Sequence, residues 1–226
     1  MDTLGTQEIL AAFAHGLADW RKLAQSLAAR YRVADPVQGA AFVSAVARAA
    51  VLAGREPEIR LGRGFVDVSL FTADLTADGG AGRWVTGGDL DFARTVSALA
   101  GEQRLTAAPQ EVAQLELALD TADDAAVAPF WSALLTGGPG NTVLDSVIDP
   151  TGRVATVWFQ KTDPHQPPRQ RWHLDLWLAP EVAADRIAAA VAAGGTVVSD
   201  AEAPAFTVLA DPDGNKVCVC TALDRE

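Results

Sequence analysis

The feature that most constrains the fold is an ordered repeat in the second half of the chain. Three signals occur twice in the same order, about 60 residues apart, as in proteins with internal repeats. The segment LALD corresponds to WHLDL, Gly137-Gly138 to Gly194-Gly195, and DPTGRVATV to DPDGNKVCV. Each copy has the pattern of a strand, a helix and further strands. The repeat therefore predicts two modules, at about residues 111–162 and 170–222, joined by the polar, proline-rich segment KTDPHQPPRQ.

Two such modules side by side would form one curved sheet with a shared inner face, which we expect to enclose a cavity. The segment RWHLDLWL, which opens the second module, alternates between two kinds of side chain. One of its faces is apolar, and the other carries Arg171, His173, Asp175 and Trp177. The last predicted strand adds Cys218 and Cys220, two apart and on one face. We expect His173, Asp175 and the two cysteines to line the inner face.

The first half has a different pattern, which predicts three helices, a strand and a last helix. Thr6 begins a helix through Leu17, and the spacing of Trp20, Leu23, Leu27 and Ala28 predicts a second helix. A long alanine-rich helix is expected from about Gln38 to Ala53, with its end at Gly54, and the alternation at residues 65–72 predicts a strand. Thr86 and Asp89 have capping-box spacing at the start of a last helix that ends at Gly101. The polar segment 101–110 suggests a domain boundary, so we expect an α+β fold with domains at 1–104 and 105–226.

Composition excludes some classes of partner. The net charge of −11 and the pI of about 4.6 disfavour binding to nucleic acid or to anionic membranes. No run approaches the roughly 20 apolar residues of a membrane span, and the first residues do not resemble a signal peptide. We therefore expect a cytoplasmic protein whose two cysteines are reduced.

The second half resembles the glyoxalase/bleomycin-resistance superfamily, also called the vicinal-oxygen-chelate proteins, over about residues 111–222. The resemblance is carried by FWSALLTG, RWHLDLWL and FTVLADPDGNKVCV. It implies paired βαβββ modules that form a cleft, in metal-dependent isomerases and dioxygenases or in metal-free drug-binding proteins.

The resemblance also implies where a metal would be held, because metalloenzymes of the superfamily use the first and last strands of each module. His173 matches the histidine that opens the second module, but Cys218 stands where the last strand has a carboxylate. The first module offers Leu117 or Ala118, then Thr156 or Trp158, with Gln160 nearby. We therefore predict no metal and no other cofactor, and leave open a zinc site of His173, Cys218 and Cys220.

The first half resembles pterin-4a-carbinolamine dehydratase over about residues 20–100. The resemblance is carried by RYRVADPVQGAAFVSAVARAAVLAGREPEIRLGRGFVDVSLFTAD and by WVTGGDLDFA. That family uses three histidines, but Arg55-Glu56 and Ala73 stand in their places here. Asp74 and Asp89 match acidic positions, and Glu56 is the remaining candidate for a catalytic base. We expect this domain to be catalytically degenerate and to serve pterin-like binding, oligomerisation or contact with the second domain.

Three functional hypotheses follow. In the first, the second domain binds a small aromatic, pterin-like or cationic molecule without a metal. The expected ligand-binding residues are Arg171, His173, Asp175, Trp177, Trp158, Gln160 and Cys218. In the second, the protein is a lyase or isomerase. It would act as a dehydratase, or it would use His173 as a base oriented by Asp175 or Arg171. In the third, it is a non-catalytic interaction module that forms a homo-oligomer, most simply a dimer.

Overall fold

A computed structural model describes residues 3–74, 82–136, 138–164, 172–192, 194–210 and 216–225. Arg171 and the second DPxG turn lie outside the described residues. The chain divides into two compact units, and of the described residues the first contains 3–72, 83–113 and 224–225 and the second contains 73–74, 82 and 114–223. Both units combine helices with sheets, which confirms the α+β class.

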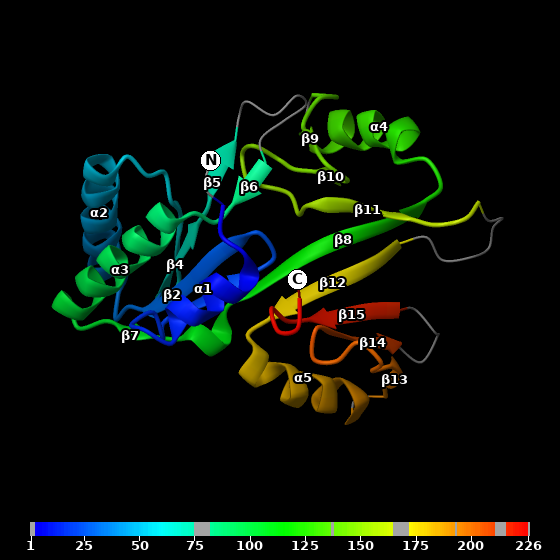
Figure 1. The fold of residues 1–226 in the computed structure, drawn as a ribbon. Helices are drawn as coiled ribbons and strands as arrows, with labels where there is room; N and C mark the ends of the chain where they lie inside the picture. Colours follow the sequence, from blue (N-terminus) through cyan, green and yellow to red (C-terminus); the bar gives the residue numbers. More distant parts are fainter. Residues whose placement is uncertain are drawn as a thin grey trace. The chain divides into compact units, whose positions relative to one another are not determined.

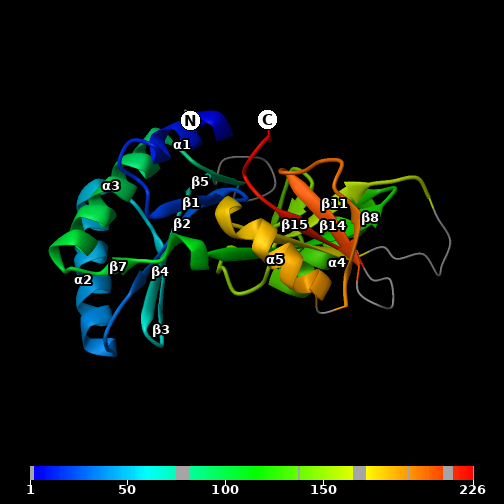
Figure 2. The ribbon, with the colours of Figure 1, turned by 90° about the horizontal axis from the view of Figure 1, so that it is seen from below.

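The first unit packs two long helices against one face of an antiparallel sheet with strand order β1-β2-β4-β3, and the short β7 also pairs with β2. Figures 1 and 2 show α2 and α3 side by side on that face. A separate pair, β5 (Thr72–Asp74) and β6 (Gly82–Trp84), forms a two-stranded sheet. The elements of the unit are α1 (Thr6–Phe13), β1 (Trp20–Leu23), β2 (Ser26–Arg32), α2 (Pro36–Ala53), β3 (Glu58–Gly62), β4 (Phe65–Leu70), α3 (Gly87–Glu102), β7 (Thr106–Ala107) and the 3-10 turn η1 (Pro109–Glu111).

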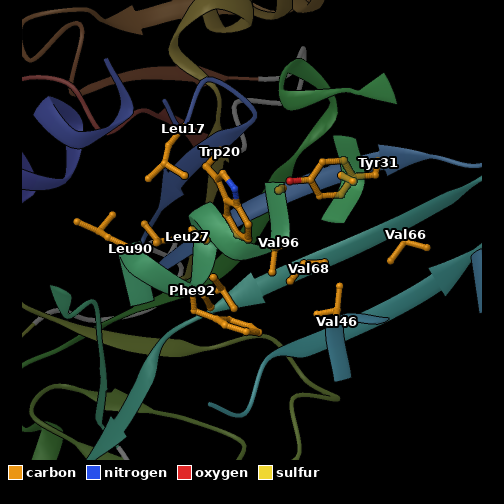
Figure 3. Close-up of a cluster of buried hydrophobic side chains, with 14 of the residues drawn as sticks. Leu17, Trp20, Leu27, Tyr31, Val46, Val66, Val68, Leu90, Phe92 and Val96 are labelled. Carbon is orange, nitrogen blue, oxygen red and sulfur yellow. The ribbon is translucent and has the colours of Figure 1, made fainter. Parts of the chain in front are cut away.

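Close packing between the helices and the sheet forms the core of this unit. Figure 3 shows Val46 of α2 and Phe92 and Val96 of α3 gathered with Val66 and Val68 of β4, all of them nearly or fully buried. The ends of both helices follow the expected local rules. The side chain of Asp35 caps α2, and Gly54 ends it with a left-handed φ of 61°.

The predicted second helix is wrong, because residues 20–32 form the hairpin of β1 and β2. Leu23 pairs with Ser26 across a two-residue turn, in which Ala24 has a φ of 44°. Trp20, Leu23 and Leu27 are buried in this hairpin, so their helical spacing is a coincidence of two short strands around a turn. β3 was not expected either.

The segment after α3 belongs to the first unit and is not a linker. β7 pairs with β2, the backbone N–H of Ala108 donates to Arg30 O at 2.8 Å, and Arg32 forms an ion pair with Glu111. The division between the units therefore lies after Ala113, later than the expected boundary at 104/105.

Helix α2 is long and apolar enough, by length and composition alone, to cross a membrane, and within the described residues it is the one helix of this kind. A single such helix is weak evidence for a span. Its Phe42 and Val46 are fully buried against the sheet, as in the core helix of a packed domain.

The second unit contains one sheet of eight strands, in the order β13-β14-β15-β12-β8-β11-β10-β9. In each module the first strand pairs in parallel with the last, β8 with β11 and β12 with β15. The two modules therefore have the same strand order, with their first strands adjacent at the centre of the sheet. The elements are β8 (Ala113–Thr121), α4 (Asp124–Thr136), β9 (Thr142–Val143), β10 (Ser146–Val147), β11 (Val157–Lys161), β12 (Trp172–Leu178), α5 (Pro180–Ala192), β13 (Thr196–Ser199), β14 (Phe206–Ala210) and β15 (Lys216–Cys220).

The first DPxG turn is held by the buried carboxylate of Asp149. It accepts hydrogen bonds from the backbone N–H and hydroxyl of Thr151 at 2.8 and 2.7 Å, and from the N–H groups of Arg153 and Val154 at 2.9 and 3.3 Å. Burial alone would raise the pKa of Asp149, but these hydrogen bonds outweigh it and lower the pKa to about 2.

The lowered pKa of Asp149 predicts that part of the folding stability is lost in acid. Because the pKa is lowered in the folded state, its contribution to stability is present above the ordinary value of 3.8 and is lost as the pH falls towards 2. Asp149→Asn should lack this contribution, so the difference in melting temperature between wild type and variant should shrink between pH 4 and pH 2. The corresponding free energy is at most about 2 kcal/mol. A difference that stays constant over this window would contradict the assignment.

Candidate functional site

The helices of the second unit cover one face of its sheet and leave the other face to polar side chains. α4 packs on Leu117 and Leu119 of β8 and on Val157 and Phe159 of β11. α5 packs on the corresponding face of β12, β14 and β15. In Figure 1 the two helices lie at opposite ends of the sheet. Because side chains alternate along a strand, the remaining residues face the other way. We call them the polar sheet face: Glu116, Ala118, Asp120, Trp158, Gln160, His173, Asp175, Trp177, Cys218 and Cys220.

His173 lies between two carboxylates on this face. Its Nδ1 is 3.6 Å from Oδ1 of Asp120 on β8, and its Nε2 is 3.7 Å from Oδ1 of Asp175 on its own strand. The Trp158 ring meets the imidazole edge to face, with 5.7 Å between the ring centroids. The side chains of His173 and Asp120 are 17% and 16% exposed, so they remain accessible from solvent. His173 and Asp175 form no direct hydrogen bond at this distance.

Two tryptophans hold two of the carboxylates in place. Nε1 of Trp158 donates to Oδ2 of Asp175, and Nε1 of Trp177 donates to Oε2 of Glu116, each at 2.8 Å. Trp177 is buried, so the structure gives it a positioning role towards Glu116, while Trp158 is partly exposed beside His173. The two indole N–H groups thus fix the positions of the Asp175 and Glu116 carboxylates.

Asp120 differs from these two carboxylates, which each accept a hydrogen bond from a tryptophan. Its Oδ1 is buried and makes no hydrogen bond within the described part of the chain, although His173 Nδ1 is near. An ionised carboxylate can only accept hydrogen bonds, so this oxygen is suited to an incoming donor. The strand register also brings the exposed Lys216 to the same face, beside His173, and adds one positive charge at its edge.

The other expected site residues are distributed along this face. Gln160 is exposed and pairs with Asp120 in the strand register, and Cys218 is partly exposed beside Asp175. Cys220 is buried at the level of Trp177, and Arg171 lies outside the described residues. Glu116 and Asp120 were not among the residues expected from the sequence. The alternation of apolar and acidic residues in LELALD would have revealed them.

In the described residues, His173, Asp175 and Cys218 form a group whose possible ligand atoms lie within 4.8 Å of one another. It includes Asp175, whereas the zinc site left open from the sequence includes Cys220. The arrangement therefore differs from the set of His173, Cys218 and Cys220.

The first unit has its own buried polar cluster, centred on Asp89. This carboxylate is 2% exposed and accepts hydrogen bonds from the backbone N–H and hydroxyl of Thr86 and from the hydroxyl of Thr72, each at 2.8 Å. Nη1 of Arg55 donates to Asp89 at 3.3 Å and to Thr72 at 3.0 Å. The guanidinium lies directly over Gly88, where an added Cβ would be 1.6 Å from Nη2. Asp89 is thus a helix cap and the partner of a partly buried arginine.

The comparisons with known protein families match both units. Residues 116–220 match the family model of a glyoxalase-like domain, and residues 2–99 match that of pterin 4 alpha carbinolamine dehydratase. The chain joins a pterin-dehydratase-like domain to a glyoxalase-like domain. Both resemblances found in the sequence are confirmed.

Among solved structures, the chain is similar to a transcriptional coactivator/pterin dehydratase from Brucella melitensis. The two are 25% identical over 44% of this chain and all of that one, with a TM-score of 0.37. The search of curated proteins gave no match.

The polar sheet face of the glyoxalase-like domain does not fit an oxygen-coordinated divalent ion. On this face β8 places Glu116 and Asp120 on either side of Ala118, but within the described residues neither carboxylate belongs to the group of His173, Asp175 and Cys218 whose ligand atoms lie within 4.8 Å of one another. Asp175 already accepts a hydrogen bond from Trp158, and Cys218 takes the place of a carboxylate. Ions such as Ca²⁺ and Mg²⁺ require about six oxygen ligands, which these residues do not supply. We derive no chemistry through a metal here.

The pterin-dehydratase-like domain does not assemble the family's histidine set. Arg55 occupies one of those positions and is committed to Asp89 and Thr72, while Glu56 is exposed between α2 and β3. The side chains of Ala73 and Asp74 lie outside the described part of the structure. Without imidazoles at these positions, the described residues offer no acid and base pair that titrates near neutral pH.

Proposed function

We propose that the glyoxalase-like domain binds a small molecule, without a metal, on its polar sheet face. The pterin-dehydratase-like domain is catalytically degenerate in this proposal. The observation that carries it is the arrangement of the partly accessible Asp120 and His173 beside the buried Asp175, on a face that the helices of the domain leave open.

The chemistry of this face indicates the class of ligand. Carboxylates are acceptors only, and the indole N–H groups of Trp158 and Trp177 are already used by Asp175 and Glu116. An incoming molecule would therefore meet unused acceptor capacity, above all at the carboxylate of Asp120, whose side chain is 16% exposed. The favoured ligand is rich in N–H donors or carries a positive charge, as an amine, guanidine or aminopyrimidine ring does.

Trp158 adds a preference for planar ligands. Its ring is partly exposed and oriented by the hydrogen bond to Asp175, so it offers a fixed aromatic surface next to the carboxylates. A flat aromatic molecule with amino groups, such as a pterin or an aromatic amine, would satisfy both features.

A thermal-shift panel on the metal-depleted full chain tests this proposal. Pterins, aromatic amines and guanidines would be compared with neutral ring analogues that lack N–H groups. A ligand at 100 times its dissociation constant stabilises the protein by about 2.7 kcal/mol, which raises the melting temperature by several degrees. We expect shifts with the donor-rich molecules alone. The absence of a shift with every class, or shifts that require added Zn²⁺, would overturn the proposal.

A second candidate is a lyase or isomerase that uses His173 as a general base. The observation that favours it is the carboxylate near each ring nitrogen, because such partners can orient an imidazole for proton transfer. If this function applies, His173→Gln should abolish turnover of a bound ligand while changing its affinity by less than about tenfold. Loss of affinity without any turnover in wild type would leave binding as the function.

A further inference from the structure

Cys218 places a partly accessible thiol on the polar sheet face, near His173. Its Sγ lies within 4.8 Å of an imidazole nitrogen of His173 and of a carboxylate oxygen of Asp175. Cys220 is two residues further along the same strand and on the same face, but it is only 3% exposed, at the level of Trp177. Neither cysteine is part of a disulfide. The two thiols therefore differ both in access and in their neighbours.

Three neighbouring strands supply a nucleophile, a base and a carboxylate in this order. Cys218 lies on β15, His173 on β12 and Asp120 on β8, and Figure 1 shows these strands side by side. On its other side from the thiol, the imidazole has Oδ1 of Asp120 at 3.6 Å from its Nδ1. A nucleophile beside a base that is oriented by a third group is the general arrangement of an activated side chain. A general base acts directly or through one water, so a separation of up to 4.8 Å is within its reach.

The charges around Cys218 have opposite signs. Lys216 precedes it by two residues on the same face and adds a positive charge, which favours a thiolate. Asp175 would repel a thiolate, but its Oδ2 accepts a hydrogen bond from Nε1 of Trp158 at 2.8 Å, which offsets part of its charge. The carboxylates of Asp175 and Asp120 also repel an anionic reagent, so a neutral electrophile fits this face better.

We infer that Cys218 is a reactive thiol that adds to α,β-unsaturated carbonyl compounds, with His173 as its base. A conjugated carbonyl compound is neutral and planar, which suits a face with two carboxylates and the partly exposed ring of Trp158. In this addition the S–H bond breaks and an S–C bond forms at the β-carbon of the electrophile. His173 takes the proton from the thiol and the α-carbon gains a proton, so the double bond becomes a saturated thioether without any oxidant. The inference goes beyond the proposed function and does not depend on reversible ligand binding.

The rate of alkylation of the metal-depleted full chain tests this inference. N-ethylmaleimide, a cyclic α,β-unsaturated dicarbonyl compound, would be added at neutral pH, and intact mass and peptide mapping would follow the adduct. We expect one adduct, on Cys218, which forms about 10-fold or more faster than the adduct of glutathione under the same conditions. Cys218→Ser should give no adduct while the chain is folded, because Cys220 is buried.

Variants of His173 test its role as the base. His173→Gln should lower the rate about 10-fold or more, whereas His15→Gln, at an exposed position of the first unit, is the matched control and should leave it unchanged. His173→Gly should also react slowly, and added imidazole should restore its rate. A purely structural role of His173 would not give this rescue.

Several results would overturn the inference. One is a Cys218 that reacts no faster than glutathione, and another is a His173→Gln variant that reacts like wild type. A third is imidazole that accelerates His173→Gly no more than it accelerates His173→Gln. Isothermal titration of Cys218→Ser with the ligands of the thermal-shift panel measures reversible binding separately, so the proposed function and this inference can fail independently.

Discussion

Substituting Gly88 by alanine is expected to destabilise the pterin-dehydratase-like domain by about 2 kcal/mol. An alanine Cβ would lie 1.6 Å from Nη2 and 2.5 Å from Cζ of Arg55, so the guanidinium would have to leave its place beside Asp89. The Asp89 carboxylate, only 2% exposed, would then lose its cationic partner. Hydrogen exchange of the α3 amides measures the free energy of opening of this domain separately from the other.

The chain supplies its own control at the neighbouring glycine. Gly87 is also in the first turn of α3, but an added Cβ there would meet no atom within 4 Å. Gly87→Ala should therefore leave the stability unchanged or raise it slightly through helix propensity. In an Arg55→Ala background the effect of Gly88→Ala should largely disappear, because the clashing group is gone. An equal loss from both glycine substitutions would refute the assigned packing of Arg55.

Replacing Asp120 by asparagine should reduce the affinity for a donor-rich ligand by about 10- to 100-fold. A hydrogen bond to a charged group is worth about 1.5–3 kcal/mol, and the amide of asparagine would present a donor where the ligand also has one. Isothermal titration of wild type and variant with the strongest ligand of the panel measures the change. Asp185→Asn, at an exposed position of α5, removes the same charge on a helix that packs on the opposite face of the sheet, and it should have no effect. Equal affinities for wild type and Asp120→Asn would exclude Asp120 from the site.

Much of the glyoxalase-like domain could be predicted because its repeat was visible in the sequence. In long strands such as β12 the side chains alternate clearly between the two faces. Such a strand can be recognised even where its ends cannot be placed to the residue. The β1–β2 hairpin could not be recognised in this way. Its strands are short, and its turn, Ala24-Gln25, has none of the glycine or asparagine residues that mark hairpin turns. The place of β7 in the first unit was missed because it depends on pairing with β2, some 75 residues earlier in the chain.

In the candidate site, too, contacts within one strand could be predicted, but contacts between strands far apart in the sequence could not. His173 and Asp175 were expected on one face because they are two apart on one strand. The neighbours of His173 depend on which strand of the other module lies beside β12, and this is β8 with Asp120. The metal-ligand positions implied by the resemblance, Leu117 and Ala118, are apolar and lie between the acidic residues Glu116 and Asp120. The hydrogen bonds from Trp158 and Trp177 also join residues far apart in the sequence.

The proposed function depends most directly on whether Asp120 and its neighbours bind a ligand without a metal. The decisive measurement is the dissociation constant of the strongest donor-rich ligand for the full chain, by isothermal titration before and after removal of metals with a chelator. We expect the same constant in both preparations. Binding that disappears after chelation and returns with added Zn²⁺ would contradict it, and would assign His173, Asp175 and Cys218 to a metal site instead.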